Sequence, residues 1–236
     1  MKGKLIVVEG TDCSGKETQS NRLCEFLNAN GIKTVKMQFP MYNTPTGKIV
    51  GGPYLGKDYI CDGFFPEGAA NVDPKVASLY YTADRIYNID KILKPLSKGI
   101  NVILDRYVES NMAHQAGKLT DEVAQNDMID WLEHLEYQFL ELPRPDMTIL
   151  LFMPYEYACE LKKNREEKAD QHEANPEHLL NAQKTYLKLA KRYGYDVINC
   201  VDDNSKRIKT IDEISEEIQK LVLETYCLTC QIDRED

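Results

Sequence analysis

The segment VVEGTDCSGKETQ, which runs from Val7 to Gln19, decides the fold of this chain. Gly10, Gly15 and Lys16 fit the pattern G-x-x-x-x-G-K, in which a glycine-rich turn aims backbone N–H groups at phosphate oxygens. The next residue is Glu17, where the pattern has a Ser or Thr whose hydroxyl binds magnesium. The segment therefore predicts a phosphate-binding loop with altered metal chemistry.

The sequence around the loop supports this reading over an ordinary glycine-containing turn. The apolar run KLIVVEG before it is typical of a buried strand, and Leu23, Phe26 and Leu27 recur after it at helical spacing. A strand before and a helix after is the context that the motif requires. The candidate phosphate-binding residues are Gly10, Thr11, Asp12, Cys13, Ser14, Gly15, Lys16, Glu17 and Thr18.

Apolar strand patterns alternate with helical patterns along the rest of the chain. This alternation predicts an α/β fold with a five-stranded parallel sheet and helices on both faces. The expected strands are KLIVVEG, KTVKMQF, INVILDR, DMTILLF and YDVINC. After the helix that follows the phosphate loop, helices are expected near 74–98, 106–117, 121–140, 155–168, 176–193 and 210–226.

Composition limits the classes of function. The chain has 236 residues and a formal net charge of −9, which argues against nucleic-acid or anionic-membrane binding but not against a small anionic ligand. Seven cysteines without a disulfide framework, and no apparent signal peptide or transmembrane span, predict a cytoplasmic protein. The pair Cys227 and Cys230 has no second pair, so zinc is not expected. We expect a single domain over 1–236.

Several motifs follow directly after predicted strands. Phe39-Pro40 follows the second strand and Asp105-Arg106 the third, as Gly10 follows the first. Ligands of parallel sheets bind at the carboxyl ends of the strands, so we expect these residues to share one site. The segment 51–72, rich in Gly, Pro and aromatic residues, is expected to be an ordered loop or lid beside it.

Four segments resemble the thymidylate kinase family of P-loop nucleoside monophosphate kinases. VEGTDCSGK resembles its phosphate loop, FPMYNTPTGKIV its Phe-Pro segment, LYYTADR its helix with a substrate-binding Arg, and LDRYVESNMAHQ its Asp-Arg-Tyr/His segment. The resemblance implies a P-loop kinase three-layer sandwich with a small lid at about 155–175. It also implies transfer of the γ-phosphoryl group of ATP to dTMP with Mg²⁺, and a homodimer.

The resemblance assigns a role to each candidate residue. Lys16 and the loop amides would bind the donor phosphates, Asp12 the 3′-hydroxyl of the deoxyribose, and Arg106 the acceptor phosphate. Asp105 would lie near the metal, and Glu17 is a second candidate metal ligand. The expected substrate-binding residues are Asp12, Phe39, Pro40, Tyr42, Tyr81, Arg85, Arg106, Tyr107, Ser110, His114 and Gln115. Among these, Arg85 would bind the thymine edge, Tyr81 would stack on the ring and Tyr107 would contact the sugar.

The lid and the Phe-Pro segment depart from the family pattern. Cys13 stands where some relatives carry a catalytic Arg, so the lid sequence ELKKNREEKADQHE would supply it, with Arg165 as the first candidate. Gln171 replaces a lid cation, and Tyr42 stands where relatives commonly have an Arg.

Each assignment has an alternative in which the residue is only structural. Arg85 and Arg106 could be surface charges, Tyr80 and Tyr81 core aromatics, and Asp105 a helix N-cap. The lid charges could form a solvated helix face. A kinase for another nucleoside or nucleoside monophosphate, and a non-catalytic nucleotide-binding protein, remain open.

Overall fold

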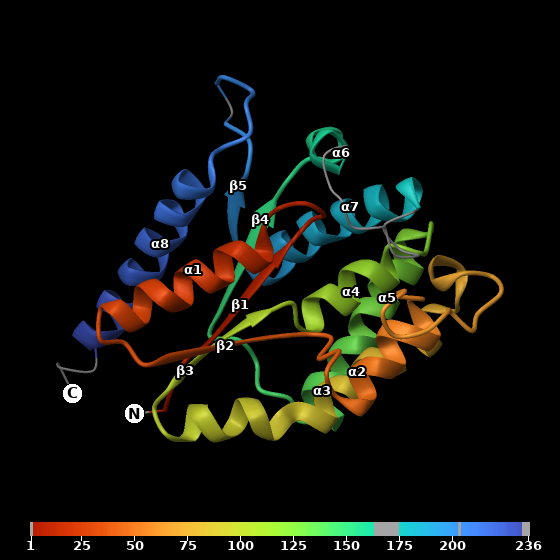
Figure 1. Cartoon of the computed structure of the whole chain (residues 1–236), viewed down its shortest axis with the longest axis horizontal. Coiled ribbons are helices and arrows are strands. Elements are labelled where there is room, and N and C mark those ends of the chain that lie inside the picture. Colours follow the sequence, from red (N-terminus) through yellow and green to blue (C-terminus); the bar gives the residue numbers. More distant parts are fainter. Residues whose placement is uncertain (1, 163–174, 203, 233–236) are drawn as a thin grey trace.

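The computed structural model describes residues 2–162, 175–202 and 204–232. Its five strands form one parallel sheet in the order β2-β3-β1-β4-β5, so that β1 lies at the centre (Figure 1). The strands are β1 (Leu5–Gly10), β2 (Thr34–Gln38), β3 (Asn101–Asp105), β4 (Met147–Phe152) and β5 (Asp196–Asn199). The predicted α/β class and the five predicted strands are therefore confirmed.

Helices cover both faces of the sheet (Figure 1). The helical elements are α1 (Lys16–Ala29), α2 (Pro45–Ile49), the π-helix η1 (Val50–Tyr54), the 3₁₀-helix η2 (Ala69–Asn71), α3 (Pro74–Ser97), α4 (Val108–Ala116), α5 (Glu122–Glu133), the π-helix η3 (His134–Phe139), α6 (Tyr155–Lys162), α7 (Pro176–Tyr193) and α8 (Ile211–Ile232). Among the described residues, none of these helices is long and apolar enough to cross a membrane.

Alternation along β1 divides the apolar core into two layers. Leu5 and Val7 face the helices α3, α4, α5 and α7, whereas Ile6 and Val8 face α1 and α8. Successive side chains of a strand point to opposite faces, so a strand covered on both sides must be apolar throughout. The one charged residue of this strand is Glu9, which is fully buried.

The segment between β2 and α3 differs from the expected loop. It contains α2 and the π-helix η1, and Val50, Tyr54, Leu55, Ala69 and Val72 form the greater part of a small core of their own. The sequence does not predict these helices, because the segment is rich in glycine, which has a low intrinsic helix propensity. Here the lack of a side chain is required: a Cβ on Gly51 would lie 2.8 Å from the ring of Tyr42.

The remaining differences lie at helix ends. The helix expected from 106 begins at Val108, because Arg106 has a φ of 67°, in the left-handed region that a helix cannot continue through. The N-cap position is Tyr107, so the reading of Asp105 as a helix N-cap is wrong. The helix expected over 155–168 is described only as far as Lys162.

Candidate active site

A cavity of about 690 Å³ opens at the carboxyl ends of β1, β2 and β3. With the exception of Arg165, every candidate site residue of the sequence lines it. The phosphate loop contributes 10–18, the segment after β2 contributes Phe39, Pro40 and Tyr42, and α3 contributes Tyr81 and Arg85. The end of β3 and the corner after it contribute Asp105, Arg106 and Tyr107, and α4 contributes Ser110, His114 and Gln115.

The phosphate loop has the backbone that an anion site requires. Cys13 and Gly15 both have positive φ values, 56° and 76°, and α1 begins at Lys16 directly after them. Gly10 permits the close turn, because a Cβ there would lie 2.4 Å from Ser14 Oγ. The left-handed residues and the helix N-terminus together point backbone N–H groups into one concavity.

Lys16 lies inside this loop, and its charged side chain is buried. Its side chain is 8% exposed, and Nζ donates a hydrogen bond to the Thr11 carbonyl at 2.9 Å. Burial, assisted by the nearby positive charge of Arg106, lowers the pKa of Lys16 to about 8. A phosphate group in the loop would reverse this shift, since an anion favours the protonated ammonium.

Arg106 is held in place by the buried carboxylate of Glu9. Glu9 accepts hydrogen bonds from the backbone N–H groups of Tyr107 and Ser110, at 2.8 and 3.1 Å, and from the hydroxyls of Ser110 and Tyr186. Burial raises the pKa of Glu9, and the charge of Arg106 opposes that rise. Arg106 is half-buried in a left-handed conformation, so the reading of it as a surface charge is wrong. Strain of this kind is concentrated at functional sites.

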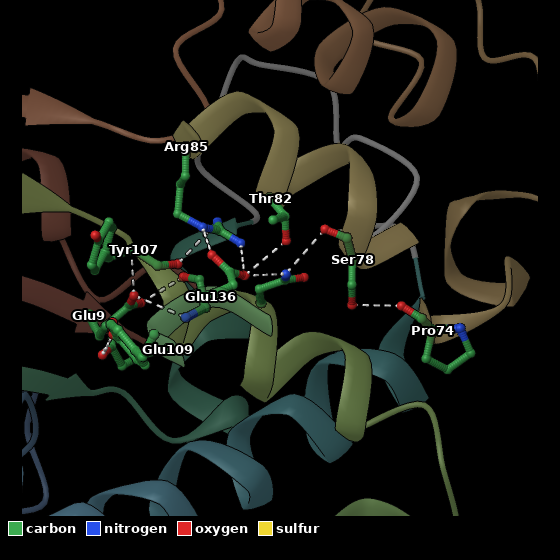
Figure 2. Close-up of polar contacts among 11 residues, drawn as sticks. Glu9, Pro74, Ser78, Thr82, Arg85, Tyr107, Glu109 and Glu136 are labelled. Carbon is green, nitrogen blue, oxygen red and sulfur yellow. Dashed lines mark hydrogen bonds and ion pairs between the residues drawn. The ribbon is translucent and has the colours of Figure 1, made fainter. Parts of the chain in front are cut away.

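Arg85 is a buried ion-pair residue. Its side chain is 2% exposed, and its Nε and one terminal nitrogen donate to the Glu136 carboxylate, which also accepts from Thr82 and Asn111 (Figure 2). The second terminal nitrogen of Arg85 lies 3.5 Å from the Tyr107 carbonyl, at the limit of a hydrogen bond. The reading of Arg85 as a solvated charge is therefore wrong, and its contact with a base stays a prediction.

Polar groups with unfilled bonding capacity gather at the α4 end of the cavity. Gln115 is fully buried, and neither its amide nitrogen nor its amide oxygen has a hydrogen-bond partner among the described residues. Asn111 Oδ1 likewise has no hydrogen-bond partner among the described residues. His114 also lines this end, but its Nδ1 is paired with His178 Nε2 at 3.1 Å. Because buried polar groups are nearly always paired, an unpaired donor and acceptor side by side indicate a ligand with a polar edge.

Two aromatic predictions concern Tyr81 and Tyr107. Tyr81 is half-buried, lines the cavity and packs edge-to-face against Tyr54 at 5.6 Å, and its stacking on a base stays a prediction. The ring of Tyr107 is fully buried, and its hydroxyl donates to the Pro143 carbonyl. The contact of Tyr107 with a sugar remains a prediction.

Magnesium ligands can be assessed from the carboxylates present. Asp105 is buried at the end of β3, and Glu17 is exposed in the first turn of α1; both line the cavity. Ser14 Oγ is buried without a hydrogen-bond partner among the described residues. Mg²⁺ is usually held by one or two carboxylates together with substrate phosphates, and this donor set fits that requirement. Of the basic lid residues, Lys163, Arg165 and Lys168 lie outside the described residues, as does Gln171, and only the backbone of Lys162 is described.

Sequence reasoning missed residues that hold the site together. Glu9 and Glu136 are buried carboxylates, and Asp84 accepts from the Met41 backbone N–H at 2.8 Å and from Thr46 Oγ1 at 2.7 Å. Lys57, Gln38, Gln183 and Tyr186 also line the cavity. Glu9 carried a signal, since a carboxylate inside an apolar strand needs a partner. The partners of the others are distant in sequence.

A phosphate loop on the central strand, an arginine at the end of its neighbour and a polar pocket beyond them define a P-loop phosphotransferase for nucleotides. The family model described as "Thymidylate kinase" matches residues 8–218, and the chain belongs to this family.

Similar proteins cover nearly the whole chain. A thymidylate kinase of Prochlorococcus marinus is 31% identical over 224 residues, which are 94% of this chain and 99% of the relative. A probable thymidylate kinase of Thermococcus kodakarensis is 31% identical over 84% of this chain and 90% of the relative. The solved thymidylate kinase of Candida albicans superimposes with a TM-score of 0.72 at 23% identity, covering 95% of this chain and 93% of that one. The predicted fold and family are therefore confirmed.

Proposed function

We propose that this chain transfers the γ-phosphoryl group of ATP to dTMP and releases dTDP and ADP. Membership of the thymidylate kinase family supports the reaction and disfavours a kinase for another acceptor or a non-catalytic binding protein. One structural observation carries it: a single cavity joins the phosphate loop to the unpaired amide of Gln115. A donor's phosphates fit the first end, and a nucleobase edge fits the second.

The charges along the cavity suit a triphosphate and a monophosphate that meet end to end. Lys16 and the loop amides bind the donor phosphates, and Arg106 binds the acceptor phosphate, where a planar guanidinium makes two parallel hydrogen bonds. The protein does little covalent chemistry in such a transfer, and positioning and charge neutralisation supply the rate. Glu9 contributes by fixing the β3–α4 corner from which Arg106 extends.

Magnesium completes the neutralisation of charge. When bound, Mg²⁺ would offset the negative charge that develops on the phosphates during transfer. Asp105, from the end of β3, would hold the ion, with Glu17 as a second ligand directly or through water. Glu17 adds negative charge near phosphates, which the ion or Lys16 must offset. Arg165 remains the proposed donor-side cation of the lid.

The chain is further proposed to work as one domain, in the cytoplasm and as a homodimer. Cys24, Cys61, Cys159 and Cys200 are thiols, as expected in a reducing compartment. Met128, Ile129 and Leu132 of α5 are buried core residues, so they are not available for a dimer interface. A better interface is α3, where the positions 76, 79, 83, 86, 90 and 93 are all exposed. Four of them are apolar and large: Val76, Leu79, Ile86 and Leu93.

Steady-state turnover with a panel of acceptors tests the proposal. The purified protein, ATP and Mg²⁺ are mixed with dTMP, dUMP, dCMP, AMP or thymidine, and ADP release is measured. We expect kcat/KM for dTMP to exceed the others by at least about tenfold, which corresponds to roughly 1.4 kcal/mol of discrimination. The variant Lys16→Ala, with unchanged folding, is expected to be inactive. Binding without turnover, or faster turnover of another acceptor, would contradict the proposal.

A further inference from the structure

Tyr42 leaves the acceptor side of the cavity one positive charge short. It follows the Phe39-Pro40 pair at the end of β2, where the family resemblance places an arginine, and it lines the cavity. A phenol donates one hydrogen bond and carries no charge at neutral pH. A monophosphate carries close to two negative charges at pH 7, and Arg106 supplies one positive charge.

Lys57 brings a cation to the same place from a different element. Its Nζ lies 5.3 Å from the centroid of the Tyr42 ring, and Lys57 and Tyr42 line the same cavity. An ammonium over an aromatic face is attracted by the ring quadrupole, so Tyr42 positions the charge that it does not itself carry.

Backbone hydrogen bonds and two glycines fix the position of Lys57 relative to Tyr42. The Lys57 backbone N–H donates to the Gly51 carbonyl at 2.8 Å, and the Lys57 carbonyl accepts from Ile60 N at 2.8 Å. Gly51 lets the π-helix η1 approach the Tyr42 ring, and Gly56 has the positive φ of 65° that turns the chain before Lys57. The segment itself is anchored by Tyr54, which is fully buried.

The location favours the acceptor phosphate over the donor phosphates. Tyr42 belongs to the segment after β2, and this segment is joined to β3 by the hydrogen bond from Phe39 N to the Asp105 carbonyl, at 3.0 Å. Arg106 comes next after Asp105. Lys57 and Arg106 therefore reach the cavity from the β2–β3 side, whereas the donor site lies on the loop between β1 and α1.

We propose that Lys57, held over the ring of Tyr42, binds the phosphate of the acceptor nucleotide together with Arg106. This inference rests on the proposed function and adds a residue to its acceptor site. The Tyr42 hydroxyl donates a further hydrogen bond to the same phosphate. Lysine suits the role because its ammonium is a compact charge on a long stem, which can reach the phosphate from a neighbouring loop. An arginine at position 42 would not need this reach.

Calorimetric titration of wild-type and Lys57→Met proteins with dTMP and with thymidine tests the proposal. Removing one charge-assisted hydrogen bond to a phosphate weakens dTMP binding by about tenfold to a hundredfold. Thymidine lacks the phosphate, so its affinity should change by less than about twofold. Lys48→Met is the matched control, because Lys48 is an exposed lysine of α2 that does not line the cavity. It should leave both affinities unchanged.

Rescue gives a second, independent readout. The double variant Tyr42→Arg with Lys57→Met returns a cation to the position where the family has one, and dTMP affinity should recover to within about threefold of wild type. An unchanged dTMP affinity in Lys57→Met, or an equal loss for thymidine and dTMP, would overturn the role of Lys57 while leaving the kinase assignment intact. A wild-type protein that binds neither nucleoside nor nucleotide would overturn the proposed function, and this inference with it.

Discussion

Lys16 combines a required charge with an environment that opposes it. The residue lies at the start of α1, inside a loop where burial lowers its pKa to about 8. The free protein therefore binds this proton less tightly than an unperturbed lysine does, and donor phosphates would strengthen proton binding. Phosphate binding and proton binding at Lys16 are thus linked.

Proton uptake on ATP binding measures that link. At pH 8 about half of the Lys16 side chains are neutral in the free protein, so ATP binding should take up roughly half a proton per site. Affinity should fall as the pH rises above about 8, because protonation then becomes costly. Titration calorimetry in buffers of different ionisation enthalpy counts the protons. Lys16→Ala removes the uptake; an uptake near zero in the wild type at pH 8 would show that Lys16 is already charged.

Glu17 can be tested as a metal ligand by restoring the usual hydroxyl. If Glu17 only replaces a hydroxyl, Glu17→Ser keeps or improves turnover at every Mg²⁺ concentration. If Glu17 binds the ion, the variant loses activity at low Mg²⁺ and regains it at high Mg²⁺ or with Mn²⁺. We expect the second result, because a carboxylate is a stronger hard-ion ligand than a hydroxyl. Turnover as a function of metal concentration decides, with Glu25→Ser as control, since Glu25 is an exposed glutamate of α1 that does not line the cavity.

At the residue scale the sequence predicted which residues line the cavity better than it predicted the residues that support them. The phosphate loop and Arg106 follow strand ends, so local pattern and sheet topology were enough to bring them together. Glu136 could not be found in this way, because its partner Arg85 lies on another helix and no local pattern marks the pair. Lys57 was missed for the same reason, since its place depends on how Gly51 packs against Tyr42.

Among the elements, helix α3 bonds to two other segments through two adjacent residues. Asp84 fixes the segment after β2 through Met41 N and Thr46, and its neighbour Arg85 is paired with Glu136 of η3. Adjacent residues of one helix thus bond to two different segments, the one after β2 and η3. The sequence predicted the helix but not this role, because both partners lie far from α3 along the chain.

The buried pair predicts a large loss of stability when its charge is broken. Glu136→Gln leaves the guanidinium of Arg85 buried without its counter-charge, which should cost about 3 kcal/mol or more in the free energy of unfolding. Urea denaturation measures it. The exposed pair Lys220–Glu224, 3.9 Å apart on α8, is the control, and Glu224→Gln should cost less than about 1 kcal/mol. Equal, small losses in both variants would show that the buried pair contributes little.

For the whole molecule, the exposed apolar face of α3, here called the seam, predicts the oligomeric state. Val76, Leu79, Ile86 and Leu93 are separated by three, seven and seven residues. This is the spacing of a helix face that packs against another helix. Light scattering should give twice the chain mass of 27.1 kDa, and Leu79→Glu with Ile86→Glu should give the monomer. Phe139→Glu, at an exposed residue of η3 outside the seam, should leave the dimer intact. A wild-type monomer at micromolar concentration would contradict the interface.

The overall architecture was the most predictable level. Five apolar runs separated by helical patterns allow few arrangements, because parallel strands need right-handed crossovers. The part that could not be predicted is the segment between β2 and α3, where α2 and η1 form through tertiary packing although they contain glycines and, inside η1, Pro53.

Transfer of label between the two substrates tests the central claim most directly. ATP carrying ³²P in its γ-phosphoryl group is incubated with the protein, Mg²⁺ and dTMP, and the products are separated by chromatography. If the cavity holds donor and acceptor phosphates end to end, the label appears in dTDP, with one ADP formed for each dTDP. Label in inorganic phosphate alone, or no transfer while both nucleotides bind, would contradict the account.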